Sequence, residues 1–205
     1  AGQYEEEVAR AEERYGDIFG AFAGVPLEEM ATDPDAVRLG RNLFLNNCAT
    51  CHGSDARGAV GFPNLTDGDW LGDSSPAGIQ NTIANGRMGV MPGWGASLGD
   101  EGVENVIAYV RTLSGNEADA AAAEAGKQQY MLYCVACHGA TGTGNTALGA
   151  PNLTDDIWLH GDDDATLRNI IANGMTNQMP GQKDVLVSED RIRAVTAYVL
   201  SLNEG

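Results

Sequence analysis

Two short motifs with the pattern Cys-x-x-Cys-His use all four cysteines of the chain and two of its three histidines. They are Cys48–Cys51–His52 and Cys134–Cys137–His138. Two thiols at this spacing can each form a thioether bond to one vinyl group of a haem, and the adjacent histidine is then held under the iron. The pattern therefore predicts two covalently bound c-type haems, with His52 and His138 as iron ligands.

The alternatives for a lone Cys-x-x-Cys pair are a redox-active dithiol and half of a zinc site. Either alternative leaves the histidine that directly follows each pair unexplained, and it does so twice. No cysteine remains for a disulfide or for a nucleophile. The two motifs are therefore interpreted as haem attachment sites.

Length and charge narrow the function classes. A chain of 205 residues has room for two domains of about 100 residues each. The 12 basic and 29 acidic residues give a formal charge of −17, which repels nucleic acid and anionic membrane surfaces and favours a partner with a basic docking patch. Ordinary surface solvation and adaptation to a salty habitat are alternative reasons for the same acidity.

The beginning of the sequence carries expectations about location. No apolar run reaches the length of a membrane-spanning helix, and the first residue is Ala1 rather than Met. We therefore expect a processed protein or a fragment of a longer chain. Since haem is attached to this motif outside the bacterial cytoplasmic membrane, we expect a periplasmic location.

The chain is a tandem repeat. An offset of 86 superimposes the first haem motif on the second. Beyond the motif the offset is 88, which aligns 63–66 with 151–154, 83–86 with 171–174, and 91–93 with 179–181. A residue kept in both copies is expected to do the same job twice, so the duplication identifies functional positions.

Helical periodicity dominates both copies, and no convincing alternating strand pattern is found. The fold class expected is mainly α: two tandem class I cytochrome c domains, each around one haem, preceded by an N-terminal helix. The predicted divisions are 1–31 (N-terminal helix and linker), 32–115 (first domain) and 116–205 (second domain). Helices are expected to begin at Thr32 or Asp33, near Ser75, before Val103 and at Ser188.

A glycine lies one helical turn before an aromatic residue in both copies, in the pairs Gly40/Phe44 and Gly126/Tyr130. Glycine lets a second helix approach closely, and the ring fills the space beside it. Tyr109 and Tyr198, on the last helix of each copy, are the expected partners.

Thioether sulfur is a common sixth ligand to haem iron in electron carriers. Of six methionines, only Met91 and Met179 occupy equivalent repeat positions, and Pro-Gly follows each of them. Proline fixes the chain direction, which suits a rigid loop that presents a side chain to a metal. We therefore predict His/Met ligation at both irons, with Met88 as the competitor at the first haem.

Further residues are expected around each haem. The carbonyls of Pro63 and Pro151 are placed to accept the ring N–H of the proximal histidine, which fixes its tautomer. Trp70 and Trp158 are expected either to donate to a haem propionate or to serve as ordinary core residues. Arg57 is a candidate for a propionate contact that the repeat does not reproduce. His160, which aligns with Gly72, is expected to be a loop residue.

These motifs resemble known families. The haem motif, Pro-Asn-Leu, Met-Pro and the closing Tyr-Val helix of each half resemble class I cytochromes c in tandem. Residues 47–58, 62–67, 89–92 and 149–155 resemble the dihaem subunit, subunit III, of cbb3-type cytochrome c oxidases, and so does the leader 4–16.

The resemblance implies a non-catalytic, periplasmic electron-transfer module. It would accept electrons from a donor cytochrome c and relay them to the monohaem subunit and then to the catalytic subunit of the oxidase. A membrane anchor is expected before Ala1 in the full-length protein. The alternatives are a free-standing soluble dihaem carrier, a dihaem dehydrogenase or peroxidase with one open iron, and a ligand sensor that releases Met91 or Met179.

Overall fold

The computed structural model describes residues 2, 6, 10 and 18–203. Much of the N-terminal helix expected within 1–31 falls on residues outside this description. Residues 18–20 are helical and a turn follows them, and α2 (Leu27–Thr32) is a separate helix in the stretch expected to be linker. No helix among the described residues combines the length and apolarity that crossing a membrane requires.

Two helices of the first copy begin at the N-cap residues that the sequence predicts. α3 (Pro34–Asn47) starts behind Asp33, whose side chain accepts hydrogen bonds from the amides of residues 35 and 36. α4 (Ala49–His52) contains the haem motif's histidine. α5 (Pro76–Asn85) starts behind Ser75 and ends at Gly86. The expected helix starts at Asp33 and Ser75 are confirmed, because a side-chain oxygen satisfies amides that have no partner within the helix.

The second copy repeats this order. Its helices are α7 (Ala120–Tyr133), α8 (Val135–His138), α9 (Asp164–Asn173), α10 (Lys183–Leu186) and α11 (Glu189–Ser201). Asp119, Asp163 and Ser188 cap α7, α9 and α11 through their side chains. The last helix of the first copy, α6 (Gly95–Leu113), begins before Val103 as expected and kinks at Gly99.

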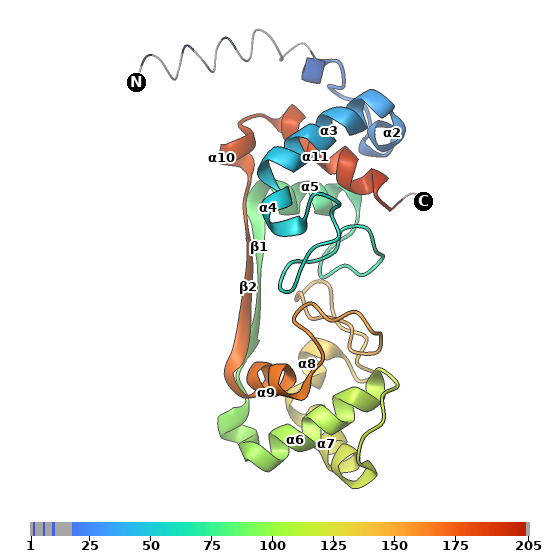
Figure 1. Ribbon diagram of the computed structural model, residues 1–205, viewed down its shortest axis with the longest axis vertical. Coiled ribbons are helices and arrows are strands. Elements are labelled where there is room, and N and C mark those ends of the chain that lie inside the picture. The colour runs from blue at the N-terminus through green and yellow to red at the C-terminus, as the bar shows by residue number, and fades with distance from the viewer. Residues whose placement is uncertain (1, 3–5, 7–9, 11–17, 204–205) are drawn as a thin grey trace.

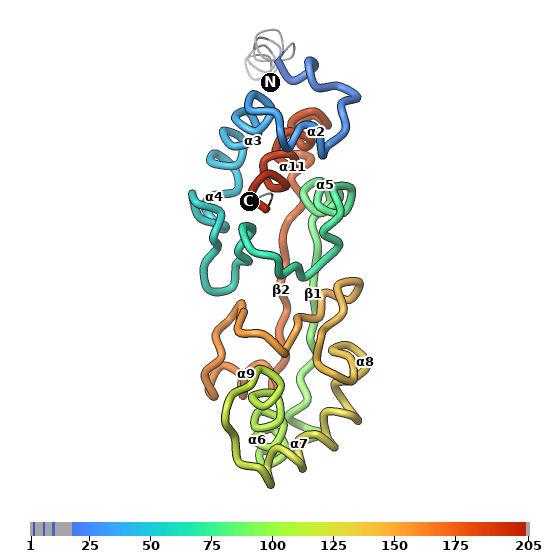
Figure 2. Tube along the Cα trace, turned by 90° about the vertical axis from the view of Figure 1, so that its right-hand side faces the viewer, coloured from blue at the N-terminus to red at the C-terminus, as the bar shows by residue number. Residues whose placement is uncertain are grey.

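Two strands contradict the expectation that strands are absent. β1 (Gly86–Pro92) and β2 (Gly174–Pro180) pair antiparallel, with Gly86 opposite Pro180 and Pro92 opposite Gly174. They form an isolated ribbon that runs along the molecule (Figures 1 and 2). A two-stranded ribbon outside any layered sheet has no continuous core-facing side, so its sequence lacks the apolar alternation of a half-buried strand.

The ribbon carries the chain from one end of the molecule to the other, so the compact units differ from the predicted domains 32–115 and 116–205. One unit, which we call the His52 unit, contains α2, α3, α4, α5, α10 and α11; the other, the His138 unit, contains α6, α7, α8 and α9 (Figure 1). Each copy therefore gives its last helix to the unit that holds the haem motif of the other copy.

The two hydrophobic cores show this exchange residue by residue. In the His52 unit, Phe44 of the first copy packs in one cluster with Val195 and Tyr198 of the second. In the His138 unit, Tyr130 of the second copy packs with Val106 of the first. The predicted boundary at 115/116 separates the sequence repeats, but burial of the apolar helix faces joins α11 to α3 and α6 to α7.

Candidate functional site

Each proximal histidine lies at the end of a four-residue helix, α4 or α8, and is buried. The Nδ1 atom of His52 lies 3.1 Å from the carbonyl oxygen of Pro63, and that of His138 lies 3.2 Å from the oxygen of Pro151. With Nδ1 occupied by a carbonyl, the N–H resides there, and Nε2 is left with a free lone pair. Both expected carbonyl contacts are present.

Burial lowers the pKa of His52 and of His138, and the hydrogen bond to the proline carbonyl opposes this shift. The neutral imidazole is therefore favoured at each position. The neutral ring is also the form that binds a metal, so the site presents its histidine ready for ligation.

The cysteines differ within each pair. Cys48 and Cys134 are the more buried members, and burial, together with the neighbouring cysteine, raises the pKa of each thiol to about 11. Cys51 and Cys137 are exposed, and all four are free. A redox dithiol needs a depressed thiol pKa, so these environments do not support that alternative. Among the described residues no group of three potential zinc ligands of the His, Cys, Asp or Glu type gathers.

The repeat-matched methionines lie in opposite units. Met179 packs against the core of the His52 unit, together with Cys48 and Trp70. Met91 packs against the core of the His138 unit, which contains Cys134 and borders Trp158. Each core therefore brings a histidine-bearing motif of one copy to the methionine of the other.

The remaining methionines are less suited to ligation. Met88 is 64% exposed and projects from the face of β1 opposite to Met91, because alternate residues of a strand face opposite ways. Met175 lies directly opposite Met91 in the ribbon register. Met30, a residue of α2, is 1% exposed, as expected of a core filler, and Met131 is 45% exposed.

The glycine–aromatic pairs have the expected partners, but from the exchanged copies. A side chain at Gly40 would overlap the backbone carbonyl of Ala194, and the Phe44 ring lies 5.2 Å from that of Tyr198. The helices approach as closely at the corresponding glycine of the other unit. A side chain at Gly126 would overlap the carbonyl of Asn105 in α6, and the rings of Tyr130 and Tyr109 lie 5.1 Å apart.

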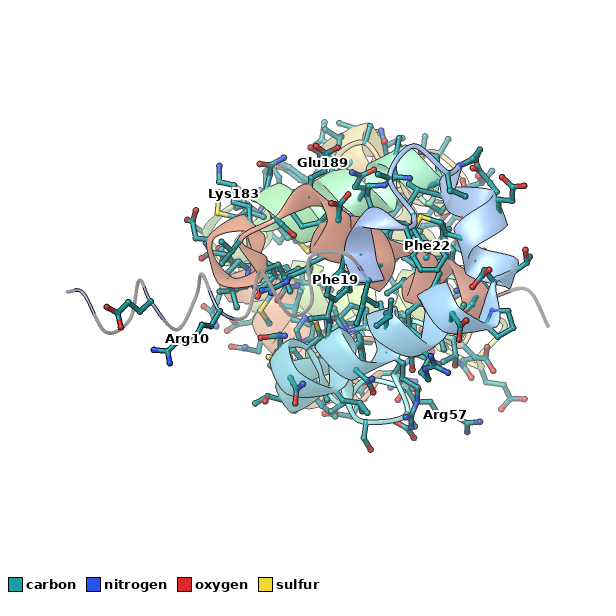
Figure 3. The ribbon with its side chains drawn as sticks, turned by 90° about the horizontal axis from the view of Figure 1, so that it is seen from above. Arg10, Phe19, Phe22, Arg57, Lys183 and Glu189 are labelled. Atoms are coloured by element: carbon teal, nitrogen blue, oxygen red, sulfur yellow. The ribbon has the colours of Figure 1, made fainter. Side chains whose placement is uncertain are left out.

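The residues expected to contact haem propionates differ in their exposure. Trp70 and Trp158 are half-buried and border equivalent cores. Arg57 is exposed and points away from the body of the protein in Figure 3. Arg87 was missed: its guanidinium lies over Gly72 and donates to the carbonyl of Leu71 at 2.6 Å, next to Trp70.

A difference between the two copies could have indicated the position of Arg87. Position 72 is glycine in the first copy, and its counterpart is His160 in the second. Arg87 covers Gly72, whereas His160 uses its own ring to contact Asn177 of β2, with 3.0 Å between His160 Nε2 and Asn177 Nδ2. In the first copy a residue of the ribbon, Arg87, covers the loop at Gly72, and in the second copy the loop residue His160 contacts the ribbon. His160 lies in a loop as expected, and its Nε2 is engaged by the amide.

The loops after the two haem motifs meet between the units. The amide of Gly61 donates to the carbonyl of Leu159 at 2.7 Å. Figure 1 shows the two loops facing each other beside the ribbon. Both sites are therefore held in one continuous structure.

The residues present fit a covalently attached haem. Each unit offers two free thiols, a buried imidazole with only Nε2 available and a half-buried thioether, which are the donors that c-type haems use. Large apolar side chains near the motifs are also exposed, among them Val60 at 79% and Leu132 at 71%. Exposure of such side chains to water carries a cost, so a large apolar group at each site suits these surroundings.

Comparison with known proteins agrees with this donor set. The family described as "Cytochrome C oxidase, cbb3-type, subunit III" matches residues 35–110 and 121–199. The chain is therefore a tandem of two cytochrome c domains of the cbb3 type, mostly helical with little sheet.

Curated relatives match along nearly the whole chain. The cbb3-type oxidase subunit CcoP of Rubrivivax gelatinosus is 45% identical over 204 residues, which is 99% of this chain and 66% of the relative. Subunit FixP of Azorhizobium caulinodans is 42% identical, covering 90% of this chain and 67% of the relative. Subunit CcoP of Cereibacter sphaeroides is 39% identical, covering 87% and 67%. The chain thus spans about two thirds of the length of these relatives. It belongs to the family of subunit III of cbb3-type cytochrome c oxidases, a cytochrome c family with covalently bound haem.

Proposed function

We propose that this chain is a dihaem electron-transfer module that relays electrons into a cbb3-type oxidase and does no bond chemistry of its own. The observation that carries the proposal is the equivalence of the two units. Each has a buried histidine held by a proline carbonyl and a methionine packed against the same core. When bound, the haem supplies one-electron redox chemistry.

The side chains have separate roles in this proposal. Cys48, Cys51, Cys134 and Cys137 would anchor the two haems. The carbonyls of Pro63 and Pro151 hold the N–H of His52 and His138 at Nδ1, which would leave Nε2 free for the iron and raise the basicity of the ring.

Methionine and tryptophan complete each site. Met91 and Met179 would be the second protein ligands of the two irons, and a thioether ligand favours a high potential. Trp70 and Trp158 would donate to propionates, with Arg57 or Arg87 as the accompanying cation in the His52 unit. With one histidine and one methionine bound to each iron, neither iron would offer a site to a substrate.

The net charge of the chain and the names of its relatives support the partners that we propose. The formal charge of −17 favours a donor cytochrome c with a basic docking patch. Relatives are named as subunits of cbb3-type oxidases, so the acceptors would be the monohaem and catalytic subunits of such a complex. The location would be the periplasmic face of the inner membrane, with an anchor in the full-length protein.

Binding of carbon monoxide tests the closed-site proposal. The native ferrous protein carrying both haems is mixed with carbon monoxide, and the Soret band is followed over seconds. We expect no rapid change at either haem. Rapid binding at one haem would favour the dehydrogenase or peroxidase alternative and overturn the relay. The mass of the intact protein provides the control, since it must include two covalent haems.

A further inference from the structure

The exchange of helices between copies is reciprocal in its backbone contacts. The amide of Trp94 donates to the carbonyl of Ile171 at 2.8 Å, and the amide of Gln182 donates to the carbonyl of Ile83 at 2.8 Å. Trp94 and Gln182 are equivalent repeat positions, and so are Ile83 and Ile171. The segment that follows the methionine of one copy is thus anchored to the middle helix of the other, in both directions.

Glycines make this junction possible. Gly86 and Gly174 end the two middle helices with φ values of 74° and 80°. A side chain at Gly86 would overlap the carbonyl of Met179, and one at Gly174 would contact the carbonyl of Met91. Only glycine adopts this backbone conformation without strain and admits a neighbouring backbone so closely. The Asn-Gly of one copy and the Met-Pro-Gly of the other therefore form one built contact.

Polar contacts outside the ribbon repeat the same pairing. Arg111, at the end of α6 in the first copy, donates to Asp164 of the second at 2.8 Å and to the carbonyl of Asp162 at 2.9 Å. Asn203, beyond α11, donates to the carbonyl of Leu65 at 2.9 Å. The closing segment of each copy is therefore joined to the haem-motif half of the other copy by side chains as well as by its apolar face.

We propose that the two haem sites exchange their axial methionines between the copies, so that His52 is paired with Met179 and His138 with Met91. This pairing rests on the His/Met ligation proposed above. Met179 lies at the end of β2 in the core of the His52 unit, and Met91 lies at the end of β1 in the core of the His138 unit. Each copy supplies the thiols and the histidine of one site and the methionine of the other.

Because the two copies are linked in one chain, the exchange costs little free energy. The same contacts form whether a last helix packs on its own copy or on its duplicate, because the contact residues are equivalent. The duplicate is present at the high effective concentration of a linked domain. Extension of 86–92 and 174–180 then adds ribbon hydrogen bonds that a folded-back chain would lack.

Cleavage of the chain between the copies tests the exchange in the protein loaded with both haems. Segment 114–119 joins α6 to α7 and is exposed at 115–117, and a protease site is inserted between Glu117 and Ala118. The two fragments each carry one covalent haem. In the exchanged arrangement, each unit is built from both fragments. We therefore expect them to co-elute after cleavage and to separate only at urea concentrations that also abolish the methionine–iron charge-transfer band. The uncleaved variant is the control.

Separation of the fragments while both keep that band would overturn the proposal, since each copy would then hold its own methionine. Absence of the band from the uncleaved protein would refute the proposed His/Met ligation and, with it, the methionine pairing. Co-elution up to the urea concentration that unfolds the helices would still support exchanged helices in that case, so the two failures are distinguishable.

Discussion

Phe44 and Tyr198 offer an energetic test of the exchanged packing. Their ring centroids lie 5.2 Å apart at an interplanar angle of 58°, and the side chains are 1% and 6% exposed. Aromatic pairs in such tilted arrangements contribute about 0.5–1.5 kcal/mol beyond the area they bury. A double-mutant cycle with Phe44→Leu and Tyr198→Leu should therefore give a coupling energy of about 0.5–1.5 kcal/mol in the free energy of unfolding.

Tyr109 is the matched control for this cycle. It lies in the Ala-Tyr-Val sequence of α6 that α11 repeats around Tyr198, yet its ring contacts Tyr130 in the other unit. Since Phe44 lies in the separate His52 core, Phe44→Leu and Tyr109→Leu should be additive within about 0.3–0.5 kcal/mol. Urea unfolding of the haem-loaded protein measures all variants, provided that the m-value stays constant. Coupling of Phe44 to Tyr109 but not to Tyr198 would refute the exchange.

Two further predictions concern packing and charge. Gly126→Ala places a methyl group against the carbonyl of Asn105 and should lower stability by about 1–3 kcal/mol, whereas Gly68→Ala, in open space, should be near neutral in the same urea titration. Burial, followed by the negative charge of Asp155, raises the pKa of Asp69. Ionised Asp69 therefore destabilises the fold, a loss that is absent below its unfolded pKa and develops as pH rises through the folded pKa. Asp69→Asn should raise the urea midpoint at neutral pH and leave it unchanged in acid; an equal shift at both pH values would contradict this reasoning.

Local structure was predictable because it depends on neighbouring residues. The caps Asp33, Ser75 and Ser188 satisfy helix amides within three positions of themselves, so the sequence contains all the information needed. The proline carbonyl contact was predictable too, because Pro63 and Pro151 lie a short loop away from the histidines they hold.

The exchange was not predictable from the repeat. Duplication makes the apolar face of α6 and that of α11 nearly equivalent, so periodicity identifies which residues are buried but not on which copy. Gly40 lies against the backbone of α11 at Ala194 and Gly126 against that of α6 at Asn105, and each of these last helices offers a tyrosine one turn further on. Chain direction at 86–92 decides between the two arrangements, and a two-stranded ribbon has too weak a pattern to reveal it.

The most direct test of the central claim determines which methionine binds the same iron as His52. Replacing Cys134 and Cys137 by Ala leaves only the first motif able to bind haem, with His52 as proximal ligand. Met179→Leu or Met91→Leu is then introduced, and the methionine–iron charge-transfer band of the oxidised protein is recorded. The exchanged sites predict that Met179→Leu abolishes the band and that Met91→Leu preserves it. Loss of the band with Met91→Leu and its retention with Met179→Leu would contradict the account.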